Sequence, residues 1–225
     1  MHKRLLITGV TGNLGKAVAA AFARQGYEVT GLARSVSEEV FSLHAPHKLV
    51  SVDLADQAEA EKGMAHLLSH AQSFDVAVLT AGGFRAGTLA DTTITELREQ
   101  IRLNAETAFV VAKPLFQRML EKGEGRLFFI GSAAGHDAAK GTGSVAYALS
   151  KSLLFHLAAL LNAMAGSQSV RAYVVVPGII DTPQNRAAMP DADRKAWLTP
   201  DDIAARLVEV CKNPISGKEP EIIEW

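Results

Sequence analysis

The sequence has 225 residues, of which 48% are hydrophobic and 21% are charged, and its formal net charge is −1 at pH 7. This is the composition of an ordinary globular protein, and at this length we expect one domain spanning residues 1–225. No run of basic residues exceeds two, so neither nucleic acid nor an anionic membrane surface is an expected partner.

Cysteine use and hydropathy favour the cytoplasm. Cys211 is the only cysteine, which excludes a disulfide within the chain and indicates a reducing compartment. The amino-terminal apolar run breaks at Thr8-Gly9 and is too short for a signal sequence. The longest apolar helix-like stretch, Leu153 to Ala165, is too short to span a bilayer. The histidines show no metal-ligand grouping with acids or with the cysteine, so no metal site is expected.

Strands and helices are predicted to alternate along the chain. The predicted strands are short apolar runs at Arg4–Thr8, Glu28–Leu32, Lys48–Val52, Asp75–Leu79, Arg126–Ile130, Val170–Val176 and Glu221–Glu224. The predicted helices cover Leu14–Gln25, a short stretch at 37–43, Asp56–His70, Thr95–Leu120 with a bend at Pro114, Val145–Ala165 and Pro200–Cys211.

This pattern predicts an α/β fold, namely a single Rossmann-type three-layer domain with a doubly wound parallel sheet of about seven strands. Strands that are apolar throughout are typical of a parallel sheet with helices on both faces. In such folds ligands bind beyond the carboxyl ends of the strands, where the strand order reverses. Functional residues are therefore expected directly after strands.

The first strand is followed by a glycine-rich turn that opens a helix. In the turn Gly9 permits a tight bend, Gly12 lets the backbone approach a pyrophosphate, and Gly15 lets the helix pack closely on the strand. The free N–H groups of the helix N-terminus would face the phosphates. A plain strand-to-helix turn is the alternative. The predicted dinucleotide contacts are Thr8, Gly9, Thr11, Gly12, Asn13, Leu14 and Gly15.

The end of the second strand indicates which dinucleotide is bound. An acidic residue there would bind the free ribose 2′-hydroxyl of NAD, whereas an arginine accommodates a 2′-phosphate. The sequence carries Arg34 and no acid in this segment, so NADP(H) is favoured over NAD(H). The alternative is that Arg34 is a solvated loop residue.

Tyr147 and Lys151 lie four residues apart on a predicted helix and therefore share one face. A phenol has an unperturbed pKa of about 10 and is a poor acid or base near neutral pH. A nearby ammonium is expected to lower this pKa, so that the pair could move a proton to or from an oxygen. The alternative is an interface tyrosine beside a solvated lysine.

Together these motifs resemble the short-chain dehydrogenase/reductase family along nearly the whole chain. The resemblance implies that Tyr147 and Lys151 are the catalytic pair and that Lys151 also binds the nicotinamide ribose. It implies that Ser132 donates a hydrogen bond to the substrate carbonyl and that Asn104 holds a proton-relay water. Further cofactor contacts implied by the resemblance are Asp53, Leu54, Ala81, Gly82, Pro177, Gly178, Ile180 and Thr182.

The resemblance implies hydride transfer between NADP(H) and a small molecule with a carbonyl, hydroxyl or imine-like group, with Tyr147 as general acid/base. Two departures from the family pattern are the glycine spacing and Thr80, which replaces an asparagine. Residues 184–198 follow the nicotinamide loop and read as a mobile substrate lid. The helices at 95–120 and 145–165 are apolar on more than one side, and in the family they pair across a two-fold axis, so a homodimer or homotetramer is expected.

A narrower resemblance concerns dihydropteridine reductase. It rests on residues 81–84, 141–143, 181–186 and 189–193 together with Trp197. Ser132 and Arg34 argue against a simple transfer of that activity, because the pterin enzymes lack this serine and use NADH. A reductase of quinonoid dihydropterin therefore remains an alternative.

Two further alternatives use the same fold. A non-catalytic NADP(H) sensor would be compatible with the glycine spacing, but it has no reason to keep Ser132, Tyr147, Lys151 and Asn104 together. A sugar-nucleotide epimerase would need a larger carboxyl-terminal substrate domain than the roughly forty residues that follow the loop from Pro177 to Thr182.

Overall fold

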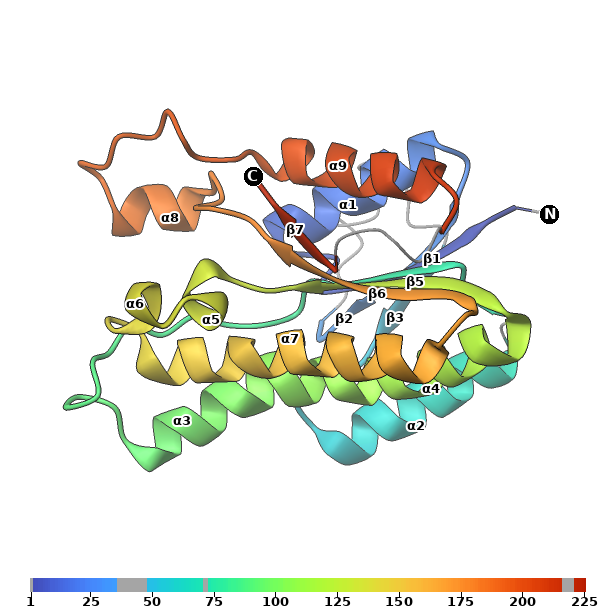
Figure 1. The fold of residues 1–225 in the computed structure, drawn as a ribbon, viewed down its shortest axis with the longest axis horizontal. Coiled ribbons are helices and arrows are strands. Elements are labelled where there is room, and N and C mark those ends of the chain that lie inside the picture. The colour runs from blue at the N-terminus through green and yellow to red at the C-terminus, as the bar shows by residue number, and fades with distance from the viewer. Residues whose placement is uncertain (1, 36–47, 71–72, 216–220) are drawn as a thin grey trace.

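A computed structural model describes residues 2–35, 48–70, 73–215 and 221–225 of the chain. These residues build a seven-stranded parallel sheet in the order β3-β2-β1-β4-β5-β6-β7 (Figure 1). The helical stretch predicted at 37–43 lies outside the described residues. The strands are β1 (Arg4–Thr8), β2 (Glu28–Ala33), β3 (Lys48–Ser51), β4 (Val76–Leu79), β5 (Glu124–Ile130), β6 (Ser169–Val176) and β7 (Ile222–Glu224).

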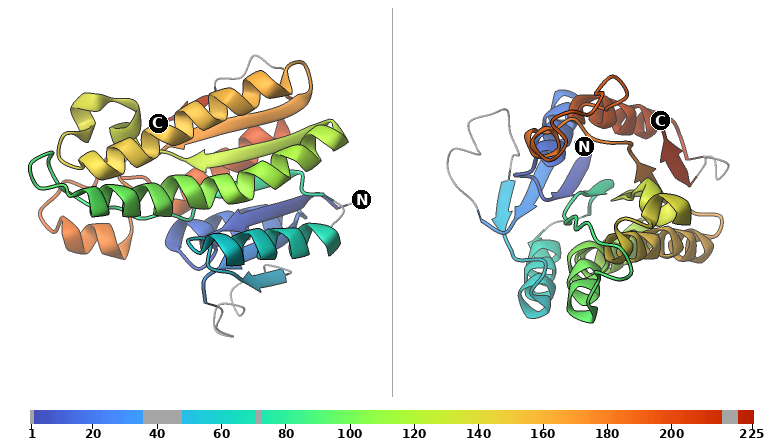
Figure 2. Two further views of the ribbon diagram at one scale, coloured as in Figure 1. Left: turned by 90° about the horizontal axis from the view of Figure 1, so that it is seen from below. Right: turned by 90° about the vertical axis from the view of Figure 1, so that its left-hand side faces the viewer.

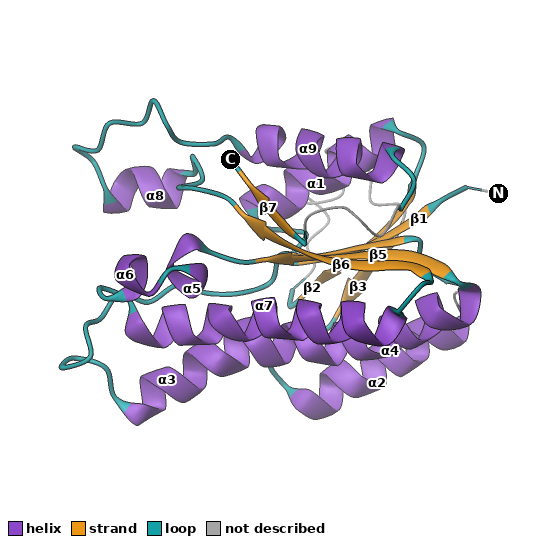
Figure 3. Cartoon of the chain, viewed as in Figure 1, coloured by secondary structure: helices purple, strands orange, loops and turns teal. Residues whose placement is uncertain are grey.

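Helices cover both faces of the sheet (Figures 1 and 2). One face is covered by α1 (Asn13–Arg24) and α9 (Pro200–Lys212). The other is covered by α2 (Gln57–His70), α4 (Thr107–Lys122) and α7 (Val145–Ala165). The predicted three-layer Rossmann-type fold is therefore confirmed. The short helices α5 (Ala133–His136), α6 (Ala138–Gly141) and α8 (Pro183–Ala188) lie beyond the carboxyl ends of the strands (Figure 3).

The two halves of the core follow from the alternation of side chains along each strand. In β5, Phe128 packs toward α1 and α9, whereas Leu127 and Phe129 pack toward α2, α4 and α7. All three of these side chains are fully buried. Burial on both faces explains why the strands read as continuous apolar runs in the sequence.

The strand order reverses at β1, which pairs with β2 on one side and with β4 on the other. The carboxyl ends of β1 and β4 are tied together by two hydrogen bonds. Thr80 Oγ1 donates to the carbonyl of Thr8 at 2.6 Å, and the amide of Ala81 donates to Thr8 Oγ1 at 3.0 Å. This is the position at which doubly wound sheets bind their ligands.

The chain is helical without a break from Ile94 to Lys122, as predicted for Thr95–Leu120, but it is not α-helical throughout. This stretch consists of α3 (Ile94–Ile101), a π-helical segment η2 at Arg102–Glu106, and α4. The amide of Thr107 donates to the carbonyl of Arg102, five residues earlier, which is the π-type spacing. Pro114, where a bend is predicted, lies inside α4, so the π-helical segment does not coincide with it. The π segment instead surrounds the buried Asn104.

Among the described residues, α7 is long and apolar enough to cross a membrane by length and composition alone, with 21 residues and a mean hydropathy of 1.3. The apolar stretch singled out in the sequence, Leu153–Ala165, is only the carboxyl-terminal part of this helix. Such a match is weak evidence, because the core helix of a globular protein meets the same test. The contacts of α7 are those of a core helix. The buried Asn162 side chain accepts from the amide of Ala172 in β6 and donates to the carbonyl of the same residue.

Candidate active site

The glycine-rich turn joins β1 to α1 with little space around its backbone. Gly9 has a φ of 62°, in the left-handed region that favours glycine. A Cβ atom on Gly15 would lie 2.2 Å from the carbonyl oxygen of Gly9, so no larger residue fits there. Helix α1 therefore begins in direct contact with the turn, as expected from the glycine spacing. Thr11 is half-buried, Gly12 and Asn13 are exposed, and Leu14 is buried in the core.

The N-terminus of α1 has no side-chain cap among the described residues, whereas α3 and α9 each carry a complete capping box. The free N–H groups of its first turn are therefore open to an external acceptor. Asn13, the first residue of α1, donates from Nδ2 to Gln184 Oε1 at 2.9 Å. This contact joins the glycine turn to α8, 171 residues further along the chain.

Arg34 is exposed just beyond the end of β2, and Ser51 Oγ donates to its carbonyl at 3.2 Å. Asp53 follows β3 and closes a tight turn, because its Oδ1 accepts from the amide of Ala55 at 2.9 Å. Leu54 is buried in the core that faces α2 and α4. Arg34 and Asp53 thus lie at the carboxyl edge of the sheet, after the first and second strands from β1, which carries the glycine turn.

Asn104 is buried to 1% exposure and connects three parts of the site. Its Oδ1 accepts from the amide of Gly83 at 3.0 Å, and its Nδ2 donates to the carbonyl of Gly83 at 2.9 Å. Nδ2 also donates to Ser150 Oγ at 3.0 Å, on α7. Both Nδ2 protons and one lone pair of Oδ1 thus hold the turn after β4 against α7, and the second lone pair of Oδ1 stays available.

Gly82 lies in that same turn, between half-buried Ala81 and Gly83. A Cβ atom on Gly82 would lie 2.5 Å from Asn104 Oδ1 and 3.5 Å from Lys151 Nζ. The turn after β4 therefore passes directly over the Asn104 amide and the Lys151 ammonium, and only a glycine leaves room for all three.

Ser132, Tyr147 and Lys151 come together at the carboxyl end of β5. Ser132 begins α5 and hydrogen-bonds the Tyr147 hydroxyl through its own hydroxyl. Lys151 Nζ donates to the carbonyl of Ile130, the last residue of β5, at 2.7 Å. It lies 5.8 Å from the centroid of the Tyr147 ring. The four predicted catalytic residues are thus brought together, with Asn104 joined to the others through Ser150.

The electrostatics of Tyr147 differ from the sequence-based expectation. Burial raises the pKa of Tyr147 above its ordinary value of 10.0, and the hydrogen bond from Ser132 opposes that rise. Lys151 is not among the groups that lower it, because its ammonium lies over the ring and is bound to Ile130. The prediction that Lys151 lowers the pKa of Tyr147 is therefore wrong for this structure. Burial lowers the pKa of Lys151 itself to about 8.

The segment after β6 forms the far side of the site. Pro177 is buried, Gly178 is exposed, and Ile180 is half-buried and bridges to Leu198. Thr182 is the N-cap of α8, and its hydroxyl accepts from the amide of Asn185 at 3.2 Å. In Figure 1, α8 lies above the carboxyl ends of the strands, whereas α5 and α6 lie below them.

Three contacts of the site were not predicted. Ser150 joins Asn104 to Tyr147, and its place three residues after Tyr147 on the same helix face could have revealed it. Gly83 supplies both backbone partners of Asn104. Gln184, the partner of Asn13, is separated from it by most of the chain, so no local pattern could have indicated this pair.

Comparison with known proteins agrees with this geometry. A family model described as short chain dehydrogenase matches residues 3–193. The chain belongs to the short chain dehydrogenase family. As a member of that family it is an oxidoreductase with an NAD(P)-binding Rossmann fold. Similarity to dihydropteridine reductase in particular is not among these findings.

The relatives of this short chain dehydrogenase cover most of its length. The 3-oxoacyl-[acyl-carrier-protein] reductase FabG of Escherichia coli is 30% identical over 193 residues, which are 84% of this chain and 78% of FabG. The sepiapterin reductase of Chlorobaculum tepidum is 28% identical and covers 99% of this chain and 96% of its own. The structure of ElxO with NADP bound has a TM-score of 0.86 at 20% identity and covers 100% of this chain and 97% of its own.

Proposed function

We propose that this protein transfers a hydride between NADP(H) and a small carbonyl, hydroxyl or imine-like substrate, with Tyr147 as general acid/base. The observation that carries the proposal is the hydrogen bond between the hydroxyls of Ser132 and Tyr147, with the Lys151 ammonium held over the tyrosine ring. This group faces the glycine-rich turn across the switch point of the sheet.

In this proposal the bound dinucleotide supplies the hydride, and the chain handles one proton. Because burial raises the pKa of Tyr147, its phenol is protonated in the neutral range and is ready to act as an acid. Ser132 donates to the substrate oxygen as negative charge develops on it. Both features favour reduction of the substrate over oxidation near neutral pH.

Lys151 acts in this proposal as a buried cation. Its pKa of about 8 keeps it protonated at neutral pH, and its bond to the Ile130 carbonyl leaves two N–H groups for other acceptors. Gly82 exposes the ammonium on one side, because no side chain stands at that position. In this proposal these N–H groups donate hydrogen bonds to the ribose hydroxyls of the dinucleotide.

The preference for NADP(H) over NAD(H) rests on Arg34. Among the described residues no carboxylate pairs with Arg34, which leaves its guanidinium available to a 2′-phosphate. The NADP in the ElxO structure supports the same assignment. The remaining contacts proposed for the dinucleotide are Thr8, Gly9, Thr11, Gly12, Asn13, Leu14, Gly15, Asp53, Leu54, Ala81, Gly82, Asn104, Tyr147, Lys151, Pro177, Gly178, Ile180 and Thr182.

Residues 184–198 are proposed as the substrate lid of a single NAD(P)-binding domain spanning residues 1–225. The base of this segment is fixed on the body of the protein, since the amide of Asp181 donates to Leu198 and the amide of Leu198 donates to Ile179. Within the segment, Arg186 forms a two-pronged ion pair with Asp181. These bonds fix both ends of the segment, which suits one that closes as a single piece between them.

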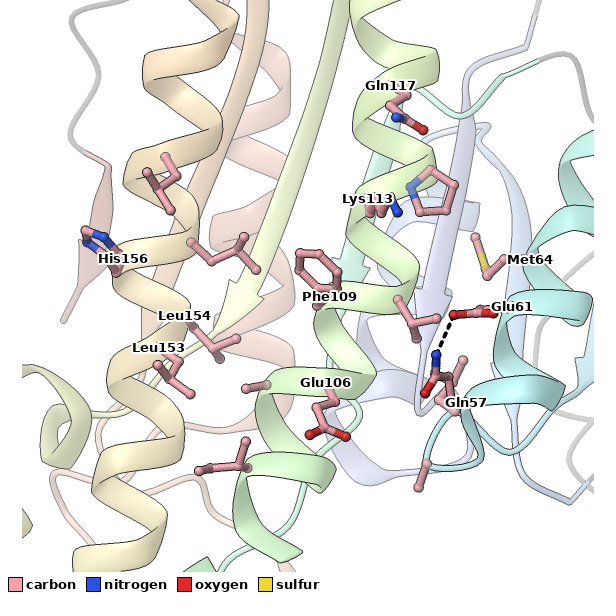
Figure 4. Close-up of a pocket in the computed structure, with 18 of the residues that line it drawn as sticks. Gln57, Glu61, Met64, Glu106, Phe109, Lys113, Gln117, Leu153, Leu154 and His156 are labelled. Carbon is pink, nitrogen blue, oxygen red and sulfur yellow. Dashed lines mark hydrogen bonds between the residues drawn. The ribbon is translucent and has the colours of Figure 1, made fainter. Parts of the chain in front are cut away.

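We further propose that the protein is a homodimer or homotetramer in the cytoplasm. A groove of about 820 Å³ runs along α2, α4 and α7 (Figure 4). Its rim carries Phe109, Leu153 and Leu160, which are 45–52% exposed. Apolar surface of this kind favours burial against a second copy, as the resemblance to the family implies. The single cysteine fits a reducing compartment.

A pterin substrate is the second candidate. The ring of Phe84 packs edge-on against Tyr147 with centroids 4.9 Å apart, yet Phe84 remains 69% exposed. An exposed aromatic ring beside the proposed acid would suit a flat, heteroaromatic substrate. The similarity to a sepiapterin reductase supports the same class.

The test is the loss of NADPH absorbance across a panel of carbonyl compounds and quinonoid dihydropterin, with Tyr147→Phe beside the wild type. Turnover that falls about 10²–10⁴-fold in the variant, with NADPH affinity retained, is the expected result. Tight NADPH binding without turnover on any substrate would favour a non-catalytic sensor. Dihydropterin as the best substrate would favour the pterin candidate.

A further inference from the structure

A second pocket lies at the opposite end of the sheet from the proposed active site. It has a volume of about 390 Å³ and opens between the amino ends of β4, β5 and β6 and the carboxyl end of α9. Arg126 lines this pocket from the start of β5, whereas Ile130, the partner of Lys151, ends the same strand. Four residues of strand separate the two by about 13 Å. A molecule in this pocket therefore does not reach Tyr147.

The two carboxylates of the pocket, Asp75 and Glu124, share one lysine. Asp75 accepts from the amide of Arg4 at 2.6 Å and forms an ion pair with Lys122. Glu124 pairs with the same Lys122 at 2.9 Å. Lys122 offsets one of these two negative charges, and the three other cations of the pocket outweigh the second.

Three cations remain: Lys3, Arg126 and Lys212 line the pocket, and none of them has an ion pair within the described ranges. One terminal nitrogen of Arg126 donates to the carbonyl of Asn213. Its Nε is buried and has no hydrogen-bond partner in the described part of the chain. A buried N–H group on a charged side chain that lacks an acceptor is costly, which points to a ligand with acceptor oxygens.

The other polar groups of the pocket are neutral. Burial, with the nearby Cys211 thiol, raises the pKa of Tyr27 to about 12, and burial raises the pKa of the Cys211 thiol to about 12. Both groups therefore stay protonated at neutral pH and repel no anion. Tyr27 adds a hydroxyl donor to the three cations.

We propose that this pocket binds a small dianion, a phosphate group carried by inorganic phosphate or by a small phosphorylated metabolite. Arg126 holds the anion through its guanidinium, and Lys3 and Lys212 close over it from the surface. A planar guanidinium matches phosphate geometry, and two lysines add point charges. The pocket volume falls within the range of ordinary ligand sites and exceeds what inorganic phosphate alone would fill.

The experiment is calorimetric titration of inorganic phosphate at constant chloride and pH. It is run with saturating NADPH, so that the glycine-rich turn does not offer a second phosphate site. We compare wild type with the double variant Lys3→Gln/Lys212→Gln and with Arg126→Lys. The latter keeps the positive charge but removes the planar guanidinium group. The matched control is Lys48→Gln/Lys62→Gln, which removes two exposed charges outside the pocket.

The expected result is saturable binding to the wild type and to the control, with affinity about tenfold or more weaker in the double variant and in Arg126→Lys. The melting temperature of the wild type should rise with phosphate concentration, and that of the double variant should rise less. Absence of saturable binding to the wild type, or equal affinity in the double variant, overturns the proposal. Neither outcome bears on turnover by Tyr147, so the two proposals fail separately.

Discussion

The Asn104 side chain donates from Nδ2 to Ser150 Oγ across 3.0 Å, and the same hydroxyl donates to the carbonyl of Tyr147 at 2.7 Å. Ser150 is fully buried, so neither bond is exchanged with water. The π-helical segment and the proposed catalytic tyrosine are therefore coupled through one hydroxyl group.

Replacing Ser150 with alanine removes that coupling. Asn104 Nδ2 keeps its bond to Gly83, but its second proton loses its best acceptor inside the protein. We expect the free energy of unfolding to fall by about 1–2 kcal/mol, and kcat to fall severalfold because the helix turn that carries Tyr147 loosens. Urea denaturation and steady-state kinetics measure the two effects.

Ser152→Ala is the matched control for Ser150→Ala. Ser152 makes the same kind of bond, to the carbonyl of Leu149 at 2.8 Å, but at the exposed side of α7. Its loss should change stability by no more than about 0.5 kcal/mol. If the two variants are equally stable and equally active, the hydrogen bonds of Ser150 contribute neither to stability nor to turnover.

The close contact of Gly15 with the glycine-rich turn predicts a large effect of one added methyl group. In Gly15→Ala the new Cβ would lie 2.2 Å from the carbonyl oxygen of Gly9, a backbone atom that cannot turn aside. We expect a loss of about 1–3 kcal/mol in stability and weaker NADPH binding, because α1 must shift away from the turn. Gly143→Ala, which meets nothing within 4 Å, should change neither property. Thermal unfolding and NADPH fluorescence titration distinguish the two variants.

Lys151 predicts a pH dependence of stability with a definite sign. Its pKa is about 8 in the folded protein and about 10.4 when unfolded, so the unfolded chain binds more protons between these values. The destabilisation from the buried charge is fully present below pH 8 and is relieved as the pH rises toward 10.4. Between pH 7 and pH 9 the wild type should gain about 1.4 kcal/mol relative to Lys151→Met.

Urea denaturation of both proteins at the two pH values measures this difference. Cys211 and Tyr27 also titrate above pH 8, but they do so in wild type and variant alike, so their contributions cancel. A difference between the two proteins that does not change with pH would show that Lys151 is not a buried cation.

Much of the fold could be predicted from the sequence because its signals are local. The strands are short apolar runs, and β1 and α7 have the predicted bounds. The π-helical segment at Arg102–Glu106 could not be predicted in this way. It depends on the bonds of Asn104 to Gly83 and Ser150, which come from two other elements. The short helix α8 was also missed, since its position depends on the bridge between Ile180 and Leu198.

The residues of the proposed site could be located, but their electrostatics could not. The order of strands brings Ser132 beside Tyr147, as the position of each after a strand or on a helix suggests. Sequence spacing gives the face that Tyr147 and Lys151 share, yet it does not say which atom the ammonium approaches. Because Lys151 bonds to Ile130 and lies over the ring, burial rather than charge dominates the pKa of Tyr147.

Arg34 predicts which cofactor the protein selects. In Arg34→Leu the guanidinium that would bind a 2′-phosphate is absent, whereas NADH has no such group to lose. We expect KM for NADPH to rise about 10–100-fold, as for the loss of a charge-assisted hydrogen bond, and KM for NADH to stay within about threefold. Arg24→Leu, on the exposed last turn of α1, is the control for loss of a surface charge. Initial rates with both cofactors and one substrate measure the ratio. An equal change for NADPH and NADH in Arg34→Leu would mean that this arginine contributes only to the general field of the site, and that the 2′-phosphate is bound elsewhere or not at all.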